Sequence, residues 1–249
     1  MCESDVIYLY DGSLAGLYSV VYHCVYSSEL PLSIIPENES EPSMMEQKYI
    51  ETDNEKAIKV RVSIPKKISP GALTMVEDVF LSCMKEKELP LLKFLLLGYE
   101  KGAAAMTMLG HVSVAPLLKA QRHLHHEAHL LKGFIRFTDY GGRLIAEITP
   151  KNFVLPYISD HFVERFPNEE FLIYDKTHKT AFIYQGRQKH YAQIDGIEYE
   201  ADETEKHYQA LWKHFYNTVA IQERYNPKCR MSHCAKRYWE NMVEMKDFI

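Results

Sequence analysis

The stretch that decides the fold runs from Gly133 to Tyr184: GFIRFTDYGGRLIAEITPKNFVLPYISDHFVERFPNEEFLIYDKTHKTAFIY. Its first part is typical of a β-hairpin. Two short runs of aromatic and β-branched residues, 134–137 and 144–148, flank a turn that contains the pair Gly141-Gly142. Because glycine adopts positive φ angles without steric cost, this pair suits a tight turn between two antiparallel strands.

The second part of the stretch repeats the hairpin pattern after a helix. Residues 171–174 and 181–184 are two more strand-like runs around a polar turn. Between the hairpins, apolar residues recur at spacings of three and four, which predicts a helix with one apolar face; they are Leu155, Ile158, Phe162 and Phe166. The stretch is therefore a ββαββ unit. We expect an α+β fold: an antiparallel sheet of hairpins with a helical cluster and two C-terminal helices.

The composition is ordinary for a chain with a packed core, with 46% hydrophobic and 25% charged residues. We expect a single α+β domain over residues 1–249, with sub-regions 1–131 and 132–249. No run approaches the roughly 18 consecutive apolar residues of a membrane span, and the N-terminus lacks the pattern of a secretory signal. The five scattered cysteines are typical of reduced thiols. These observations predict a cytoplasmic protein without a membrane partner.

Charge is distributed unevenly along the chain, whose net charge is −5. Residues 1–57 carry 11 acidic and 2 basic side chains, whereas residues 204–249 carry eight Lys and Arg against five Asp and Glu. A basic tail on an acidic protein is a hint of an anionic partner.

The N-terminal segment predicts a strand, 6–10, followed by a helix that begins near Leu14. Asp11 and Ser13 lie between them, where either side chain can accept a hydrogen bond from the first turn of the helix. The same geometry could hold a phosphate group. Capping is the commoner role of such residues. Asp11 and Ser13 are nevertheless a candidate polar site. Neither GxxxxGK[ST] nor GxGxxG occurs here, so nucleotide binding has little support.

A helical cluster is predicted for the middle of the chain. Thr52-Asp53-Asn54-Glu55 matches a capping box and predicts a helix over 53–66, although the alternation of apolar residues from 58 to 64 equally suits a strand. Ser69-Pro70 predicts the start of the next helix. Further helices are expected over 90–97, 103–109 and 112–131.

Two helices are predicted at the C-terminus. The first, 204–220, carries Tyr208, Leu211, Trp212 and Phe215 on one face. A basic loop, 223–228, leads to the second, 230–245.

Two groups of residues resemble metal sites without completing one. His125 and His129 share a helical face, but the zincin motif needs His-Glu-x-x-His, and no spaced third ligand follows. Cys229 and Cys234 with His233 lack two further ligands at suitable spacing. We therefore expect no metal and no cofactor. No GxSxG and no cysteine in a known local signature point to nucleophilic catalysis, and catalytic residues stay unassigned.

The strongest functional signal is a cluster of cations and aromatic rings near the C-terminus. Its candidate nucleic-acid-binding residues are Arg224, Lys228, Arg230, Lys236 and Arg237, interleaved with Tyr225, Tyr238 and Trp239. Cations neutralise phosphates, and rings stack on unpaired bases. The alternative is that Tyr238 and Trp239 pack the last helix onto the body while the charges are only solvated. Adjacent helical residues diverge by about 100°, so we expect Trp239 to face inward and Arg237 outward.

Three separated stretches together resemble one bacterial family. They are YLYDGSLAGLYSVVY at 8–22, EAHLLKGFIRF at 127–137 and ERYNPKCRMSHCAKRYW at 223–239. The family is described as probable DNA metabolism or repair proteins, encoded beside a radical S-adenosylmethionine protein. A related domain occurs fused to a uracil-DNA glycosylase-type domain.

The resemblance implies an accessory role in DNA metabolism or repair, with DNA or the radical S-adenosylmethionine protein as partner. The present sequence contains no glycosylase domain and no three-cysteine cluster motif, so neither chemistry carries over to it. Two alternatives remain open: an enzyme with a pocket near Asp11-Gly12-Ser13, and a purely structural partner-binding module.

Overall fold

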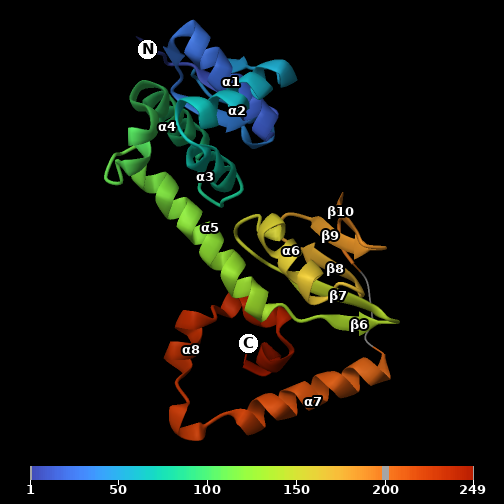
Figure 1. The fold of residues 1–249 in the computed structure, drawn as a ribbon. Coiled ribbons are helices and arrows are strands. Elements are labelled where there is room, and N and C mark those ends of the chain that lie inside the picture. Colours follow the sequence, from blue (N-terminus) through green and yellow to red (C-terminus); the bar gives the residue numbers. More distant parts are fainter. Residues whose placement is uncertain (1, 198–201, 249) are drawn as a thin grey trace. The chain divides into compact units, whose positions relative to one another are not determined.

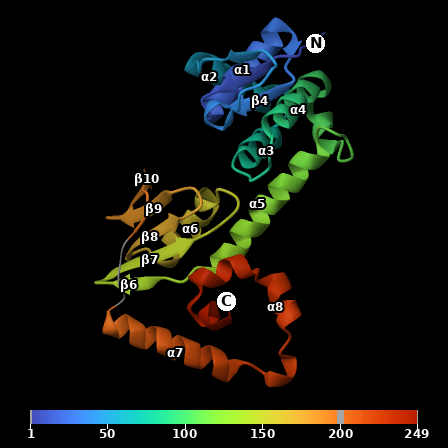
Figure 2. The same ribbon diagram turned by 180° about the vertical axis from the view of Figure 1, so that it is seen from behind.

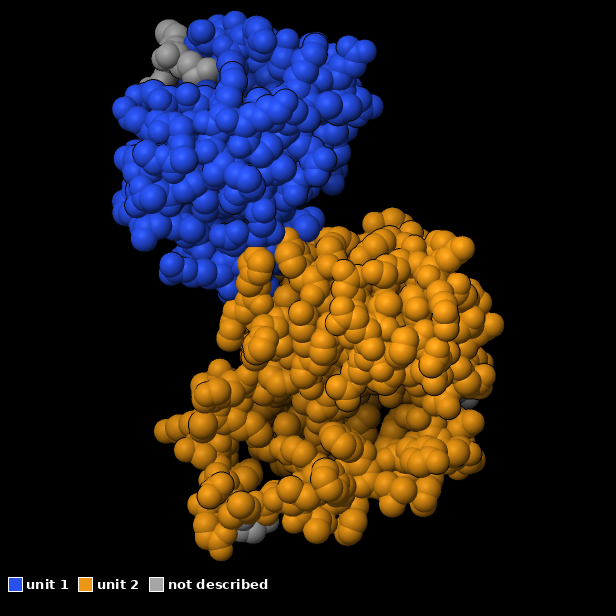
Figure 3. All heavy atoms as spheres, in the orientation of Figure 1, with its two compact units in different colours: residues 1–124 blue, residues 125–249 orange. Residues whose placement is uncertain are grey.

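A computed structural model describes residues 2–197 and 202–248 of the chain. Contacts within it define two compact units, Met1–Leu124 and His125–Ile249, which Figure 3 distinguishes by colour. Helices and strands are mixed along the chain, so the predicted α+β class is confirmed. No helix among the described residues is long and apolar enough to cross a membrane.

The first unit contains a small parallel sheet. Strand β2 (Ile7–Tyr10), which the sequence predicts, lies between β4 (Ser33–Pro36) and β5 (Gln47–Tyr49) and runs parallel to both. Helix α1 (Leu14–Ser27) connects β2 to β4, as a parallel pair requires a crossover connection. A short parallel pair, β1 (Cys2–Glu3) and β3 (Glu29–Leu30), and a 3-10 turn, η1 (Glu37–Glu39), complete this part.

Helices make up the rest of the first unit: α2 (Asn54–Lys67), α3 (Pro70–Phe80), α4 (Glu88–Lys101) and the 3-10 segment η2 (Gly102–Thr107). The helical interpretation of 53–66 is confirmed. Its cap is Asp53, one residue after the predicted Thr52, because the Asp53 carboxylate accepts from the N–H groups of Glu55 and Lys56. Ser69 caps α3 ahead of Pro70, as predicted.

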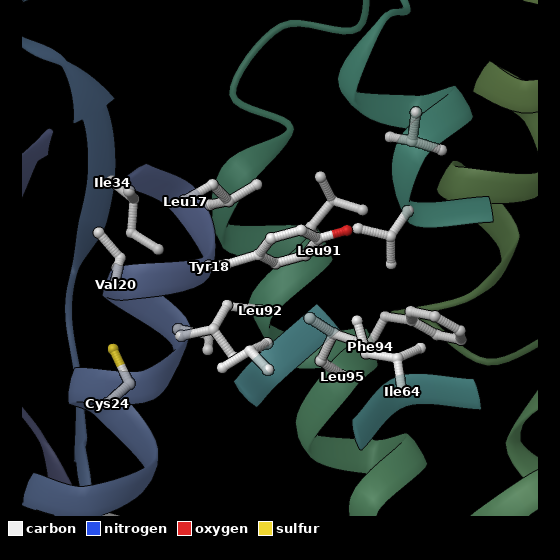
Figure 4. Close-up of a cluster of buried hydrophobic side chains, with 14 of the residues drawn as sticks. Leu17, Tyr18, Val20, Cys24, Ile34, Ile64, Leu91, Leu92, Phe94 and Leu95 are labelled. Carbon is white, nitrogen blue, oxygen red and sulfur yellow. The ribbon is translucent and has the colours of Figure 1, made fainter. Parts of the chain in front are cut away.

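The core of the first unit lies between α1, β4, α2 and α4 (Figure 4). Leu17, Tyr18 and Val20 of α1 pack in a cluster with Ile34 of β4 and with the apolar face of α4. Four α4 residues in this cluster are almost completely buried: Leu91, Leu92, Phe94 and Leu95. This burial stabilises α4, since tertiary packing contributes most of a helix's stability.

Helix α5 (Ala115–Phe134) begins in the first unit and ends in the second (Figures 1 and 2). The helix predicted over 112–131 is confirmed. It extends further than predicted, however, so the strand expected over 134–137 is wrong. Phe134 is still helical, and the first strand of the sheet begins at Thr138.

The second unit contains a five-stranded sheet in the order β10-β9-β8-β7-β6. The strands are β6 (Thr138–Tyr140), β7 (Arg143–Ile148), β8 (Glu170–Asp175), β9 (Thr180–Gln185) and β10 (Gln188–Gln193). The second predicted hairpin forms, β8 with β9, and a hairpin also forms around Gly141 and Gly142, which have the expected positive φ. Its first strand is β6, however, and not the predicted 134–137. The expectation of a wholly antiparallel sheet needs a correction, because β7 and β8 pair in parallel.

The parallel pair follows from helix α6 (Leu155–Arg165), which carries the chain from the end of β7 back to the level of its start. The predicted stripe of α6 is confirmed: Leu155, Ile158 and Phe162 are buried. Phe137, from the loop after α5, contacts the rings of Phe162 and Phe171 with centroids 5.3 and 5.8 Å apart. This contact fixes the loop against α6 and β8.

The C-terminal region consists of α7 (Glu203–Val219), η3 (Gln222–Arg224), α8 (Pro227–His233), η4 (Lys236–Asn241) and η5 (Val243–Phe248). The single helix predicted over 230–245 is wrong, because the chain is extended at Cys234 and Ala235. The Trp239 indole N–H donates to the Cys234 carbonyl at 2.9 Å. Tyr238 and Trp239 follow the break, in η4, and both are buried.

Candidate nucleic-acid interface

Helix α7 carries an apolar face that packs only in part. The Asp202 carboxylate caps the helix by accepting from the N–H of Glu205 at 2.8 Å. Tyr208, Leu211, Trp212 and Phe215 lie on one face as predicted, but they are not buried: Tyr208 is 63% exposed and Phe215 is 55% exposed. An apolar stripe that a helix leaves open to solvent marks a candidate binding surface.

This stripe forms one wall of a groove of about 920 Å³ within the second unit. The groove is hereafter called the α7 groove. Its other walls are the end of α5, the loop 135–137 and the end of α6, and the residues that matter below are Lys132, Arg136, Arg165, Tyr208, Trp212 and Phe215. The volume falls in the range of small-molecule sites, about 300–1,000 Å³.

Three cations line the α7 groove: Lys132, Arg136 and Arg165. Lys132 and Arg165 are exposed. The Arg165 guanidinium lies 5.6 Å from the centre of the Phe166 ring, and that of Arg136 lies 5.4 Å from the Trp212 ring. Because an arginine stacked on a ring keeps its charge, the groove presents cations and aromatic faces side by side.

Ionic contacts hold α7 beside the groove. The Arg136 Nη2 atom donates to Glu244 Oε1 at 2.6 Å, and Lys213 Nζ contacts both carboxylate oxygens of Asp247 at 3.0 Å. Burial acts to raise the pKa of Glu244, but the hydrogen bond and charge of Arg136 outweigh it and the pKa lies below its ordinary value. Glu244 is therefore ionised at neutral pH and keeps Arg136 in place.

The five predicted nucleic-acid-binding residues divide into two groups. Arg224, Lys228 and Lys236 are exposed on the C-terminal segments and can reach an external anion. Arg230 and Arg237 are half-buried and have internal roles. The Arg230 guanidinium lies over the Phe248 ring at 4.4 Å and the Trp239 ring at 5.4 Å. Three of the five predicted residues are therefore exposed at the surface.

Arg237 does not face outward as predicted, although Trp239 is buried as expected. The Arg237 Nη2 atom donates to Glu127 Oε1 at 2.9 Å, and the guanidinium lies 4.4 Å over the Tyr238 ring. The partner is a carboxylate on α5, 110 positions earlier in the chain. No local periodicity could have indicated this contact.

Glu127 is a buried carboxylate that joins three segments of the second unit. Besides Arg237, it accepts from the N–H groups of Lys151 and Asn152, from the Asn152 side chain and from the Tyr238 hydroxyl. Burial alone would raise its pKa, but the hydrogen bonds outweigh burial and the pKa lies below its ordinary value. Glu127 thus connects α5 to the β7–α6 loop and to η4.

Both side chains of the candidate polar site at the N-terminal turn, Asp11 and Ser13, accept hydrogen bonds from other groups of the protein. Ser13 caps α1 by accepting from the Gly16 N–H at 2.9 Å. Asp11 accepts from the Ser13 N–H at 2.9 Å and from the Thr52 hydroxyl at 2.8 Å. Partial burial would raise the pKa of Asp11, but these hydrogen bonds lower it overall. Gly16 is required here, since a Cβ atom would lie 2.1 Å from Asp11 Oδ1.

The residues considered as metal ligands make other contacts. The His125 ring lies 5.3 Å from that of Tyr157, and Cys229 Sγ lies 3.7 Å from His233 Nδ1. Within residues 2–197 and 202–248, no three His, Cys, Asp or Glu side chains come close enough together to hold a metal ion.

One family model matches the chain over residues 85–244, more than half of its length. The family is described as a domain of unknown function, DUF4130. The chain belongs to this family. No curated protein matches the chain. The matched segment includes every residue named above in the α7 groove, together with Glu127 and the C-terminal cations.

Sequence reasoning identified the stripe of α7 but not the groove. Lys132, Arg136 and Arg165 come from two elements and a loop that lie far from α7 in the sequence. The signal that could have indicated them is the run Lys132-Gly133-Phe134-Ile135-Arg136-Phe137, in which basic and aromatic residues alternate.

Proposed function

We propose that the chain is an accessory protein of DNA metabolism or repair that binds single-stranded DNA in the α7 groove. The observation that carries the proposal is the groove's combination of exposed aromatic rings with cations. Stacking of a base on an aromatic side chain contributes about 1–3 kcal/mol per base, and Lys and Arg neutralise the phosphates. The resemblance to DNA metabolism proteins agrees with this substrate.

The dimensions of the stripe suit a short single strand. From Tyr208 to Phe215 the helix advances roughly 10 Å at about 1.5 Å per residue. A strand that rises about 3.4 Å per nucleotide would place about three bases along this length. Duplex DNA hides its base faces, so it cannot use the rings of Trp212 and Phe215. Single strands are therefore the preferred ligand.

The exposed cations outside the groove extend the proposed surface. Arg224 and Lys228 lie on the connection that follows α7, and Lys236 lies on η4. These residues would contact phosphates without reading sequence. We therefore expect binding with little base preference and a strong dependence on salt.

The test is fluorescence anisotropy with a labelled oligothymidylate and a duplex of equal length, on the complete protein. Trp212→Ala and Phe215→Ala should each weaken binding of the single strand roughly five- to a hundredfold, the equivalent of about 1–3 kcal/mol. Tyr140→Ala removes a ring that is 51% exposed on β6, outside the groove, and should leave affinity unchanged. Equal affinity of the groove variants and wild type would overturn the proposal.

A second readout uses the protein's own fluorescence. The chain has two tryptophans, and Trp239 is buried whereas Trp212 is 40% exposed. In a Trp239→Phe background, a base stacked on Trp212 should quench the remaining emission. Saturable binding without quenching would place the DNA elsewhere on the protein.

A second candidate function is docking of a protein, of which the radical S-adenosylmethionine protein implied by the resemblance is the first to examine. The observation that favours it is that exposed apolar residues continue after Phe215, to Val219 and Ile221. Nuclease treatment during a pull-down of the complete protein separates the two functions. A partner that stays bound after nuclease and is lost in Val219→Asp supports docking.

A further inference from the structure

A second hollow lies in the first unit, between α1, β5 and the start of α2, with a volume of about 520 Å³. We name it the lysine hollow and define it by Tyr22, His23, Tyr26, Lys48, Glu51 and Lys56. It shares no residue with the α7 groove. An inference about it therefore stands independently of DNA binding.

The distribution of charge singles out this hollow. Among residues 1–57, which carry 11 acidic side chains, the two basic side chains are Lys48 and Lys56. Both line the lysine hollow. Glu51 is the acidic residue of the lining. Both positive charges of an otherwise strongly acidic segment thus lie in one hollow. Such a concentration of positive charge attracts anions.

Lys48 makes an unusual contact. Its Nζ atom lies 3.2 Å from His23 Nε2 and 5.6 Å from the centre of the Tyr8 ring. Because an ammonium group only donates, His23 Nε2 must accept, and the imidazole is neutral with its proton on Nδ1. The ion pairs between described residues do not include Lys48. Its direct contacts, to His23 and to the Tyr8 ring, are with neutral groups, and the negative charge of Glu29 also acts on it.

His23 can add a third positive charge when an anion enters. Burial, and then the charge of Lys48, lower the pKa of His23. The negative charge of Glu29 acts in the opposite direction and that of Lys56 in the same direction, and the pKa lies below its ordinary value. An anion that takes the ammonium group of Lys48 would remove the contact that keeps Nε2 unprotonated. The imidazolium then becomes a second donor to the same anion, so binding of the anion and protonation of His23 favour each other.

Lys56 is tethered loosely beside this pair. Its Nζ atom lies 3.0 Å from Asp53 Oδ2, but both side chains are substantially exposed, and an exposed ion pair of this kind is weak because solvent screens it. The ammonium also lies 5.9 Å from the centre of the Tyr22 ring. An incoming anion can therefore recruit Lys56 at little cost.

We propose that the lysine hollow binds a phosphate group through Lys48, His23 and Lys56. A compact ammonium acts as a point charge toward phosphate, whereas carboxylate recognition favours the planar fork of arginine. The stacked rings of Tyr22 and Tyr26, with centroids 4.2 Å apart, form an aromatic wall on which a base can lie. The phosphate group could belong to inorganic phosphate or to a nucleoside 5′-monophosphate.

The experiment follows His23 by NMR in the complete protein at pH 7, with its imidazole signals assigned by their loss in His23→Gln. Inorganic phosphate, thymidine 5′-monophosphate and thymidine are titrated in turn. Both phosphate-bearing probes should shift the His23 signals saturably toward the protonated form, and thymidine should not. Tighter binding of the nucleotide identifies a base on the tyrosine wall, whereas equal affinities identify phosphate alone.

Lys48→Met should weaken phosphate binding roughly tenfold or more, the loss expected for one charge-assisted contact. Lys59→Met removes an exposed lysine from the same helix as Lys56, outside the hollow, and should leave binding unchanged. Circular dichroism establishes that each variant is folded. Absence of a saturable shift in wild type, or equal losses in Lys48→Met and Lys59→Met, would overturn the assignment. If Lys48→Met does not fold, Lys56→Met is the variant compared with Lys59→Met.

Discussion

The buried carboxylate of Glu127 is expected to contribute strongly to the stability of the second unit. It accepts hydrogen bonds from two backbone N–H groups, an amide, a hydroxyl and a guanidinium, and its residue is 1% exposed. Removing the carboxylate takes an acceptor from the buried groups of Asn152 and Tyr238 and the ionic partner from the half-buried Arg237. We expect Glu127→Ala to lower the free energy of unfolding by about 3–5 kcal/mol, measured by urea denaturation. A loss below 1 kcal/mol would contradict this account.

The same residue makes stability depend on pH. Because the pKa of Glu127 is lower in the folded state than in the unfolded chain, its contribution is present above the unfolded value of roughly 4.3 and is lost as pH falls through the folded value. The difference in unfolding free energy between wild type and Glu127→Ala should therefore shrink below about pH 4. A difference that stays constant from pH 7 to pH 3 would show that the carboxylate is not the cause.

Phe162 tests the packing of α6 on the sheet. Its side chain is 3% exposed, and its ring contacts Phe137 and Phe166. Phe162→Ala deletes a large buried ring, and we expect a loss of about 3–5 kcal/mol in the free energy of unfolding. Phe248→Ala, which removes a ring that is 39% exposed, serves as the matched control and should cost less. Equal losses in the two variants would argue against the role of Phe162.

Residues differ in how far the sequence predicts their surroundings. Trp239 is buried as expected, whereas Trp212, which has the same side chain, is 40% exposed. Arg237 pairs with a carboxylate in a helix that is distant in the sequence. Residue type alone therefore predicts neither which apolar side chains stay exposed nor which polar groups pair.

Among the elements, α1 depends on a cap that the sequence already indicates. Ser13 accepts from the N–H of Gly16, and Asp11 holds the turn through Ser13 and Thr52. Replacement of either Ser13 or Asp11 by Ala should lower the free energy of unfolding by about 1 kcal/mol. Thermal or urea unfolding gives the measurement. Unchanged stability together with loss of a bound phosphorylated ligand would instead favour an active site at this turn.

Two elements differ from their predictions for the same physical reason. At 134–137 the strand propensity of Phe and Ile favours a strand, yet α5 continues because its end packs in the second unit. At 234–235 the helical pattern is continuous, yet the chain is extended, and the Trp239 indole N–H donates to the Cys234 carbonyl across the break. Local propensity is a weak preference, and tertiary packing decides the boundary.

On the scale of the whole molecule, different charged residues are expected to serve the proposed DNA binding and the stability of the fold. Arg224 and Lys228 are exposed, so Arg224→Ala and Lys228→Ala should each flatten the dependence of log K on log salt by about 0.7 for single-stranded DNA. Arg237→Ala should instead lower the free energy of unfolding, because it leaves Glu127 without its cation. A salt titration of anisotropy and a urea titration measure the two effects. Slopes equal to that of wild type would show that Arg224 and Lys228 do not belong to the proposed DNA-binding surface.

Several elements of the fold could be predicted from hydrophobic spacing, but the pairing of β7 with β8 and the candidate site could not. The hairpins, α6 and α7 follow from apolar residues at periods of two and of three to four. The α7 groove depends on how far α7 stands from the α5–β6 loop, a distance that no local pattern encodes. The sequence predicts that the stripe of α7 shares one face, and its exposure is visible only in three dimensions.

The parallel pairing of β7 with β8 has a consequence for the order in which the second unit folds. Each hairpin closes a loop of only a few residues, and such local structure forms in about 1–10 microseconds. Pairing β7 with β8 requires the intervening α6 segment to be in place first, and contacts between distant residues form slowly. Pulse-labelling hydrogen exchange during refolding should therefore protect the amides between β8 and β9 before those between β7 and β8. The centre of the sheet would be the last part of it to close.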